Sequence, residues 1–208
     1  MSIRTRFATL TLALAGTLAA PHAARAGGLI EGFYGVARPP DTSFSSAVSG
    51  AKADVFKGGL QHAGADVLLD FGGPLEIGAF GDVTWKHDSA SQSNLGALIG
   101  LKFDFDTIRI DALGEVGGHH YGNLANNPSI VSSSSTSQWL AYIGLRPGVI
   151  FQFSKPGFFL GVWTYARWDL TSKNVPVTVS SAGSAVSDGT VKLGGTSIGA
   201  DLRAGFTF

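Results

Sequence analysis

The last eleven residues of the chain, 198–208, alternate between apolar positions and positions that are polar or glycine. A period of two is typical of a β-strand with two different faces, because successive side chains of a strand point to opposite sides of the sheet. Seven earlier segments show the same alternation, so the sequence predicts an all-β chain. The eight expected strands are residues 29–37, 63–71, 75–86, 95–105, 108–121, 138–153, 158–170 and 191–208.

The connections between these strands alternate in length. Residues 72–74, 106–107 and 154–157 are expected to form tight turns, and residues 87–94 a medium connection. Residues 38–62, 122–137 and 171–190 are expected to form long loops. Long loops on one rim and short turns on the other are typical of an outer-membrane barrel, whose turns lie on the periplasmic side.

The charged residues of the expected strands fall almost entirely on the polar face. Lys192, near the start of the last strand, is the exception. The face opposite the charges is apolar and suited to lipid. Ten acidic and six basic residues share the polar face: Glu31, Asp66, Asp70, Glu76, Asp82, Lys86, Lys102, Asp104, Arg109, Asp111, Glu115, Arg146, Arg167, Asp169, Asp201 and Arg203.

Aromatic residues on the apolar face gather at the strand ends. Three tryptophans lie next to long loops, and several phenylalanines lie next to turns or at residue 208, so the pattern predicts two aromatic belts at the membrane interfaces. These residues are Trp85, Trp139 and Trp168 for one belt, and Phe71, Phe105, Phe153, Phe158 and Phe208 for the other. Pro147 lies on the apolar face in the middle of a strand, where it cannot donate a ladder hydrogen bond, so we expect a bulge or a local distortion there.

With its eight alternating strands, its loop asymmetry and a final strand that ends in Phe, the sequence resembles the small eight-stranded outer-membrane β-barrels of Gram-negative bacteria, the OmpA transmembrane domain and its OmpX-like relatives. The resemblance implies an eight-stranded antiparallel up-and-down transmembrane β-barrel over residues 27–208. It also implies a setting in outer-membrane lipid and lipopolysaccharide, and an assembly signal at Phe206 and Phe208 that the barrel-assembly machinery reads. The resemblance covers architecture and carries no specific activity.

A soluble lipocalin-like barrel, with its apolar face turned inward around a ligand, is the alternative fold. The aromatic belts, the loop lengths and Phe208 favour the membrane barrel.

The N-terminal 26 residues have the features of a secretory signal. Arg4 and Arg6 precede an apolar run at 7–20, and Ala24 and Ala26 match a small-x-small cleavage site. The full chain has 15 basic and 15 acidic residues and no Cys. Removing residues 1–26 leaves 12 basic and 15 acidic residues, a net charge of −3, which argues against a nucleic-acid partner. The expected location is therefore the outer membrane, reached by export.

Eight strands enclose only enough room for side chains, so we expect the inward charges to form a packed ion-pair network that plugs the barrel. Its expected members are Glu76, Asp82, Lys102, Arg109, Asp111, Glu115, Arg146, Arg167, Asp169, Asp201 and Arg203. Glycines at 78, 96, 100, 117, 144, 148, 161, 199 and 205 are expected to be recesses for bulky inward neighbours. The alternative is a proton or ion path lined by the four arginines.

Three motifs that would indicate catalysis or metal binding fail on inspection. Lipid A deacylases of the outer membrane place a Ser two positions after a His, whereas Tyr121 and Gly122 follow His119 and His120 at that spacing. The G-x-S-x-G match at 195–199 lies within an expected strand rather than at a strand–turn–helix. The carboxylates at 104 and 106 lack the ligand spacing of a calcium loop, so we expect neither enzyme activity, nor a metal, nor a cofactor.

The sequence thus predicts a non-enzymatic integral outer-membrane protein with a structural or loop-mediated surface role and an unspecified extracellular ligand. A narrow porin-like channel is the second hypothesis, and a lipid-modifying enzyme is the third.

Overall fold

The computed structural model describes residues 27–40, 43–46, 52–54, 56, 59–71, 73–86, 91–122, 138–181 and 184–208. The expected signal segment 1–26 and most of the expected loop 122–137 lie outside these residues. The described residues form twelve strands. No helix among them is long and apolar enough to cross a membrane.

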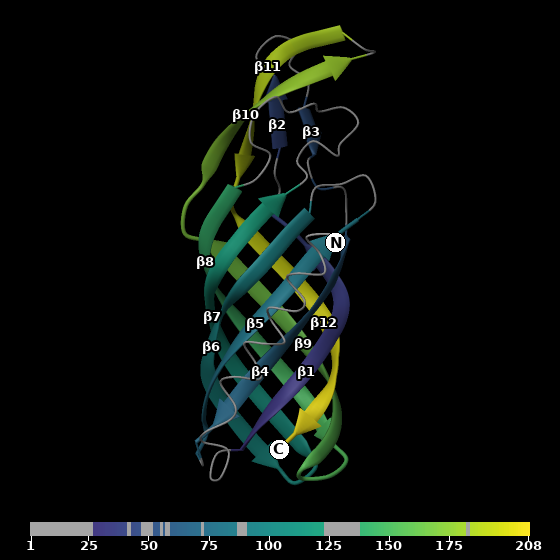
Figure 1. The fold of residues 1–208 in the computed structure, drawn as a ribbon, viewed down its shortest axis with the longest axis vertical. Coiled ribbons are helices and arrows are strands. Elements are labelled where there is room, and N and C mark those ends of the chain that lie inside the picture. Colours follow the sequence, from purple (N-terminus) through teal and green to yellow (C-terminus); the bar gives the residue numbers. More distant parts are fainter. Residues whose placement is uncertain are drawn as a thin grey trace, which may run out of the picture.

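Eight strands close into a barrel in the order β1-β12-β9-β8-β7-β6-β5-β4, and every neighbouring pair is antiparallel (Figure 1). The all-β, eight-stranded antiparallel barrel predicted from the alternation is therefore confirmed. Its strands are β1 (Gly27–Arg38), β4 (Leu60–Asp70), β5 (Leu75–Trp85), β6 (Ser91–Phe105), β7 (Ile108–Gly122), β8 (Gln138–Gln152), β9 (Gly157–Asp169) and β12 (Thr196–Thr207).

The first and last strands close the barrel. The register of β1 on β12 runs from Leu29 opposite Thr207 to Arg38 opposite Ile198. Below this ladder, the backbones of Gly28 and Phe208 exchange two hydrogen bonds of 3.0 Å. Closure leaves no strand edge in the barrel, which is the condition for a sheet to expose an apolar face to lipid.

The two ends of the barrel differ. At the end that we call the turn end, residues 71–74, 106–107 and 153–156 connect β4 to β5, β6 to β7 and β8 to β9. The two-residue turn at 106–107 places Asp106 at φ 50°, a left-handed conformation that Asp tolerates better than most residues. Phe208 also lies at this end, and the opposite end, with the longer connections, is the loop end (Figure 1).

Four further strands form a sheet beyond the loop end, where the sequence predicted only loops. They are β2 (Ser43–Ser46), β3 (Lys52–Asp54), β10 (Lys173–Ser181) and β11 (Ser184–Leu193), in the order β10-β11-β2-β3. Because β10 follows β9, β11 precedes β12, β2 follows β1 and β3 precedes β4, this order repeats the order of the barrel strands β9-β12-β1-β4. The sheet therefore prolongs the wall over half of the barrel (Figure 1). We call it the loop-end sheet.

The prediction of one strand over 191–208 is wrong. β11 ends at Leu193 and β12 begins at Thr196. Gly194 and Gly195, between them, have φ of 105° and 148°, in the left-handed region that residues with a Cβ rarely adopt. The chain therefore leaves the loop-end sheet at these glycines and enters the barrel. Lys192 belongs to β11, which explains why it did not fit the pattern of the barrel strand.

The bulge considered at Pro147 is absent from this described part of the wall. Pro147 is opposite Ala112 in an unbroken register with β7. On the β9 side, the offset at Leu145 and Ala166 is the same as at Gly148 and Trp163, so no residue is inserted. Arg146 and Pro147 have no paired residue on β9, and this interruption of the ladder is the local distortion that a residue without an N–H imposes.

Candidate functional site

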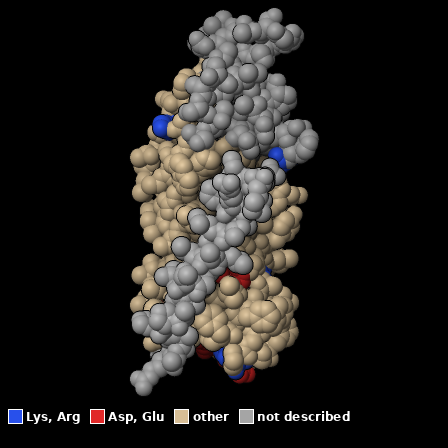
Figure 2. Space-filling view, in the orientation of Figure 1, with Lys and Arg blue, Asp and Glu red and all other residues tan. Residues whose placement is uncertain are grey.

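The outward face of the barrel is apolar along its length. β8 alternates strictly between exposed and buried positions from Trp139 to Gln152, and large aliphatic side chains such as Leu202 and Val36 are 70% and 61% exposed. In Figure 2 the described side of the barrel is mostly tan; red and blue atoms lie at its lower end, a red patch lies about midway, and some blue atoms lie nearer the upper end.

Aromatic side chains gather on this face near both ends. At the loop end, the rings of Tyr34 and Trp85 lie 6.5 Å apart, and Trp139 lies 5.0 Å from the ring of His120. At the turn end, Phe158 contacts two rings, those of Phe153 at 5.8 Å and Phe206 at 5.6 Å. Phe206 and Phe208, which are expected to form an assembly signal, belong to the aromatic belt at the turn end and are 58% and 47% exposed.

The inward face carries the charges. Eleven of the sixteen charged residues that the pattern placed on this face are buried. Asp70, Lys102 and Asp169 are half-buried, and Lys86 and Asp104 are exposed at the strand ends. We call the residues of the buried arginine–carboxylate pairs the central network; its members are Glu31, Asp66, Glu76, Asp82, Arg109, Asp111, Glu115, Arg146, Arg167 and Arg203.

Two arginines share one glutamate in the middle of the lumen. Arg146 donates from Nε to Glu115 Oε1 at 2.5 Å and from Nη1 to Asp66 Oδ2 at 2.9 Å. Arg167 donates from Nε to Glu115 Oε2 at 2.6 Å and from Nη2 to Asp82 Oδ2 at 2.7 Å. Asp66 on β4 lies opposite β8 in the strand order, and Asp82 on β5 lies opposite β9, so the Arg146–Asp66 and Arg167–Asp82 pairs cross the lumen. Glu115 on β7, by contrast, is on the strand next to that of Arg146.

The other two arginines continue the central network toward the turn end. Arg203 donates from Nε to Glu31 Oε2 at 2.6 Å and from Nη1 to Asp111 Oδ2 at 3.2 Å. Arg109 donates from Nε to Asp111 Oδ1 at 2.5 Å and from Nη2 to Glu76. Each guanidinium therefore satisfies two carboxylates, which is what makes a buried charge tolerable in a low-dielectric interior.

Aromatic rings fill the space between the arginines. The guanidinium carbon of Arg146 lies 4.6 Å from the Phe80 ring centre, that of Arg203 lies 3.3 Å from the Trp163 ring centre, and that of Arg167 lies 4.4 Å from the Tyr165 ring centre. Cation–π contacts of this kind strengthen when water is excluded.

Inward glycines make room for these rings. A methyl group added at Gly96 would lie 2.8 Å from Phe80, and one at Gly117 would lie 3.0 Å from Tyr142. At Gly148 it would overlap the indole of Trp163. Each of these rings lies over the glycine that is paired with it on the neighbouring strand.

Two histidines, His62 and His119, join the ionic lumen to the loop end. His62 is not among the residues predicted from the sequence, and His119 enters there only as part of a catalytic motif that fails. His62 holds Asp201 Oδ1 at 2.8 Å from Nδ1 and Asp82 Oδ1 at 3.0 Å from Nε2, and its side chain is fully buried. The signal was present, because His62 shares its face with Asp66, but it precedes the expected start of the strand by one residue.

His119 is the second of these histidines. It pairs with Asn94 through Nδ1 and lies 3.4 Å from Asp169 Oδ1 through Nε2. Tyr121 donates to Asp169 Oδ2 at 2.9 Å. Asp169 therefore lies with His119 and Tyr121 at the loop end, apart from the arginines that the sequence grouped with it.

Apolar side chains are buried beyond this polar layer. The ring of Phe56 lies 6.1 Å from that of Tyr121, and both are buried. The other buried apolar residues of this end are Leu60, Val175, Val191 and Leu193.

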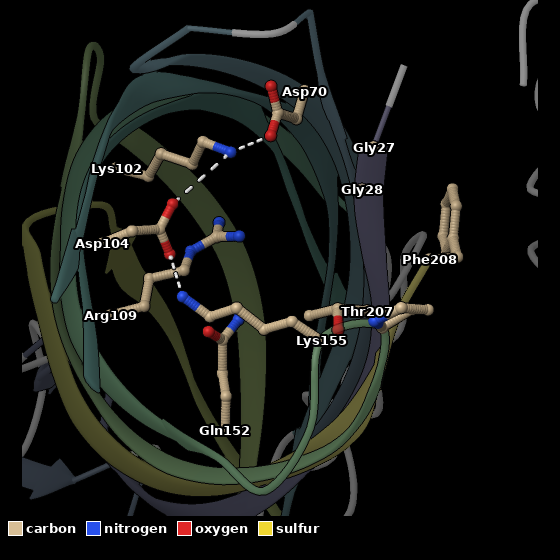
Figure 3. Close-up of a pocket in the computed structure, with 11 residues that line it drawn as sticks. Gly27, Gly28, Asp70, Lys102, Asp104, Arg109, Gln152, Lys155, Thr207 and Phe208 are labelled. Carbon is tan, nitrogen blue, oxygen red and sulfur yellow. Dashed lines mark ion pairs between the residues drawn. The ribbon is translucent and has the colours of Figure 1, made fainter. Parts of the chain in front are cut away.

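The turn end holds an open pocket of about 320 Å³, which we call the vestibule (Figure 3). It is lined by Gly27, Gly28, Asp70, Lys102, Asp104, Arg109, Gln152, Lys155, Pro156, Thr207 and Phe208. Lys102 pairs with Asp70 and lies 3.6 Å from Asp104, which lies 3.5 Å from Lys155. Lys102, expected in the central network, therefore lines the vestibule instead.

The sites that could suggest catalysis are not assembled. His120 faces outward beside Trp139, and Ser197 of the G-x-S-x-G match is buried inside the barrel within β12. Within the described ranges, no group of three or more His, Cys, Asp or Glu residues could hold a metal ion.

Solved structures with a similar fold are small outer-membrane barrels. The outer membrane protein OprG from Pseudomonas aeruginosa matches with a TM-score of 0.56 and 12% identity, over 88% of this chain and 95% of that chain. Neisserial surface protein A (NspA) matches with a TM-score of 0.51 and 11% identity, over 88% of this chain and 99% of that chain. No protein-family model matches the sequence, and no curated protein matches it either. The chain thus has the fold of the small eight-stranded outer-membrane barrels.

Proposed function

We propose that this protein is an integral outer-membrane barrel whose lumen is plugged by its own side chains, and whose role is structural or carried by the surface at its loop end. We place the turn end of the barrel on the periplasmic side of the membrane and the loop-end sheet on the cell exterior. The fold it shares with OprG and NspA, the apolar outward face and the two aromatic belts support this proposal.

The plugged lumen is supported by four buried arginines, each bound to two carboxylates, with pairs such as Arg146–Asp66 and Arg167–Asp82 that cross the barrel. Opening a pore through this layer would require several of these ion pairs to separate inside the protein. A buried charge that loses its partner costs about 3–5 kcal/mol, so the closed arrangement is strongly favoured.

Planar-bilayer recording of the purified protein tests the plug. We expect the native barrel to be silent and Arg146→Ala and Arg167→Ala to leak, because each removes a group that fills the lumen and leaves carboxylates unpaired. Steady, ion-selective conductance in the native protein would refute the plug and favour the narrow channel. The vestibule favours that second hypothesis in one respect, since it opens one end of the lumen to solvent.

Labelling of single cysteines tests the orientation, because the native chain has none. Lys192 at the loop end and Lys155 at the turn end are both exposed, so each can be replaced by Cys. In intact cells, a membrane-impermeant maleimide should label Lys192→Cys, and it should label Lys155→Cys only after the outer membrane is permeabilised. The reverse pattern would contradict the proposed orientation.

We also propose that Phe206 and Phe208 guide assembly. Both lie in the belt at the turn end, next to the seam where β12 meets β1. Phe105 has a similar exposure, 59% against 47% for Phe208, so it provides a matched control. Phe208→Asp should lower the amount of folded protein in the membrane several-fold more than Phe105→Asp, as measured by heat-modifiable gel mobility. Equal losses would assign Phe208 to the lipid interface alone.

A further inference from the structure

The vestibule meets the central network at one residue, Arg109. Arg109 belongs to both, because it binds Asp111 and Glu76 of the network and also lines the vestibule. Figure 3 shows Lys102, Asp104, Arg109, Gln152 and Lys155 converging on the same open space from different parts of the wall. A ligand in this space would meet five polar side chains and would not have to pass through the barrel.

The charges of the vestibule are of both signs, and those of Asp104 are loosely paired. The two ion pairs of Asp104 measure 3.6 Å to Lys102 and 3.5 Å to Lys155. In the Lys155 pair, the two side chains are 44% and 37% exposed. An exposed pair at this distance is held by little energy, so a ligand can replace either partner.

Gln152 supplies a second, independent indication of a ligand. Its side chain is buried to 95%, since only 5% is exposed, and its Oε1 has no hydrogen-bond partner in the described structure. Figure 3 shows this side chain pointing into the vestibule. A buried acceptor without a partner is costly, and a donor placed in the vestibule would satisfy it.

We propose that the vestibule binds a small zwitterion that carries a phosphate and an ammonium group. The phosphate contacts Arg109 and Lys155, and the ammonium contacts Asp104 and Gln152 Oε1. A simple anion would meet Asp70 and Asp104, and a simple cation would meet three basic side chains, whereas a zwitterion matches both signs. The volume of about 320 Å³ is at the small end of the range for ligand pockets, which suits such a molecule.

This chemistry has two sources near the turn end: a free phosphoethanolamine-type solute, or the headgroup of phosphatidylethanolamine at the membrane surface. The assignment of this end to the periplasm rests on the proposed function. The binding itself does not, because it depends only on the walls of the vestibule.

Calorimetric titration of the purified barrel in an uncharged, phosphate-free detergent tests the free-solute arm. Phosphoethanolamine should bind at least about tenfold more tightly than inorganic phosphate or ethanolamine alone, because each of these satisfies only one sign of charge. Lys155→Gln should weaken phosphoethanolamine at least about fivefold, and Gln152→Leu should weaken it while leaving the response to phosphate unchanged. Lys192→Gln at the loop end is the matched control and should bind as the native barrel does.

Nanodiscs containing phosphatidylethanolamine test the headgroup arm, with phosphatidylglycerol nanodiscs as the comparison. A Lys155-dependent preference for phosphatidylethanolamine without a response to soluble phosphoethanolamine would assign the site to the headgroup, and a response to the soluble compound would assign it to a free solute. Absence of both responses, or responses that Lys155→Gln leaves unchanged, would overturn the proposal. A conducting barrel would refute the plug and leave these binding results intact, so the two failures are distinguishable.

Discussion

The central network and the vestibule both pair basic with acidic side chains, yet the pairs that Asp104 makes in the vestibule are longer, more exposed and made with lysine. Arg146 and Arg167 hold their carboxylates at 2.5–2.9 Å with side chains that are 2% and 1% exposed. Lys155 lies 3.5 Å from Asp104, and these side chains are 44% and 37% exposed. The guanidinium fork engages two carboxylates at once, whereas an ammonium at the mouth keeps much of its water.

This difference determines where in the lumen a ligand can replace an ion pair. Pairs without water cannot be exchanged for a ligand except at large cost, and pairs in water can. Inward charges along the same strands therefore form tight, buried pairs in the central network, where aromatic rings fill the space around them. They form longer, exposed pairs around Asp104 in the vestibule. Three experiments test this contrast.

The largest effect is expected from Arg167→Met. It removes a buried guanidinium and leaves Glu115 and Asp82 each without one of its partners, so we expect a loss of about 3–5 kcal/mol in the free energy of unfolding. The same change at Lys155 should cost less than about 0.5 kcal/mol. Urea titration of both variants in lipid vesicles measures the difference, and equal losses would remove the contrast between the two regions.

An intermediate effect is expected from Gly148→Ala. The added methyl group overlaps the indole of Trp163, and overpacking of this kind typically costs about 1–3 kcal/mol. Gly32→Ala is the control, because there the nearest atom, the carbonyl oxygen of Gly64, is 3.8 Å away. If the two alanines were equally tolerated in the same titration, the recesses would not be what closes the lumen.

The smallest effect is expected from salt. Raising the ionic strength shortens the Debye length from about 10 Å at 0.1 M to about 3 Å at 1 M, which screens exposed pairs much more than buried ones. The small cost of Lys155→Met should therefore vanish in 1 M salt, while that of Arg167→Met should persist. A loss for Arg167→Met that falls with salt would indicate that water reaches the central network.

The sequence predicts the faces of the barrel strands because a period of two requires no knowledge of partners. Arg146, Arg167 and Arg203 were therefore assigned correctly to the polar face, but their partners were not identified. Arg146 and Asp66 are 80 positions apart, and Arg167 and Asp82 are 85 apart, so their pairing depends on the order in which the strands close.

The same limit explains the elements that the sequence analysis missed. Residues 173–181 alternate like a strand, but β10 and β11 are stabilised partly by β2, whose Phe44 is opposite Val191. A short strand in a segment rich in Ser and Gly becomes evident only when its distant neighbour is known. His62 was missed for a related reason, because strand ends are the least certain part of a periodic pattern.

The loop-end sheet is joined to the barrel by four covalent connections, which follow β1 and β9 and precede β4 and β12. These connections span two to five residues each, 194–195 being the shortest. A surface loop on two flexible connections can swing freely, but a sheet attached at four points around half of a rim cannot tilt without stretching at least one of them. Any partner of this sheet would therefore meet it at one fixed angle to the barrel axis.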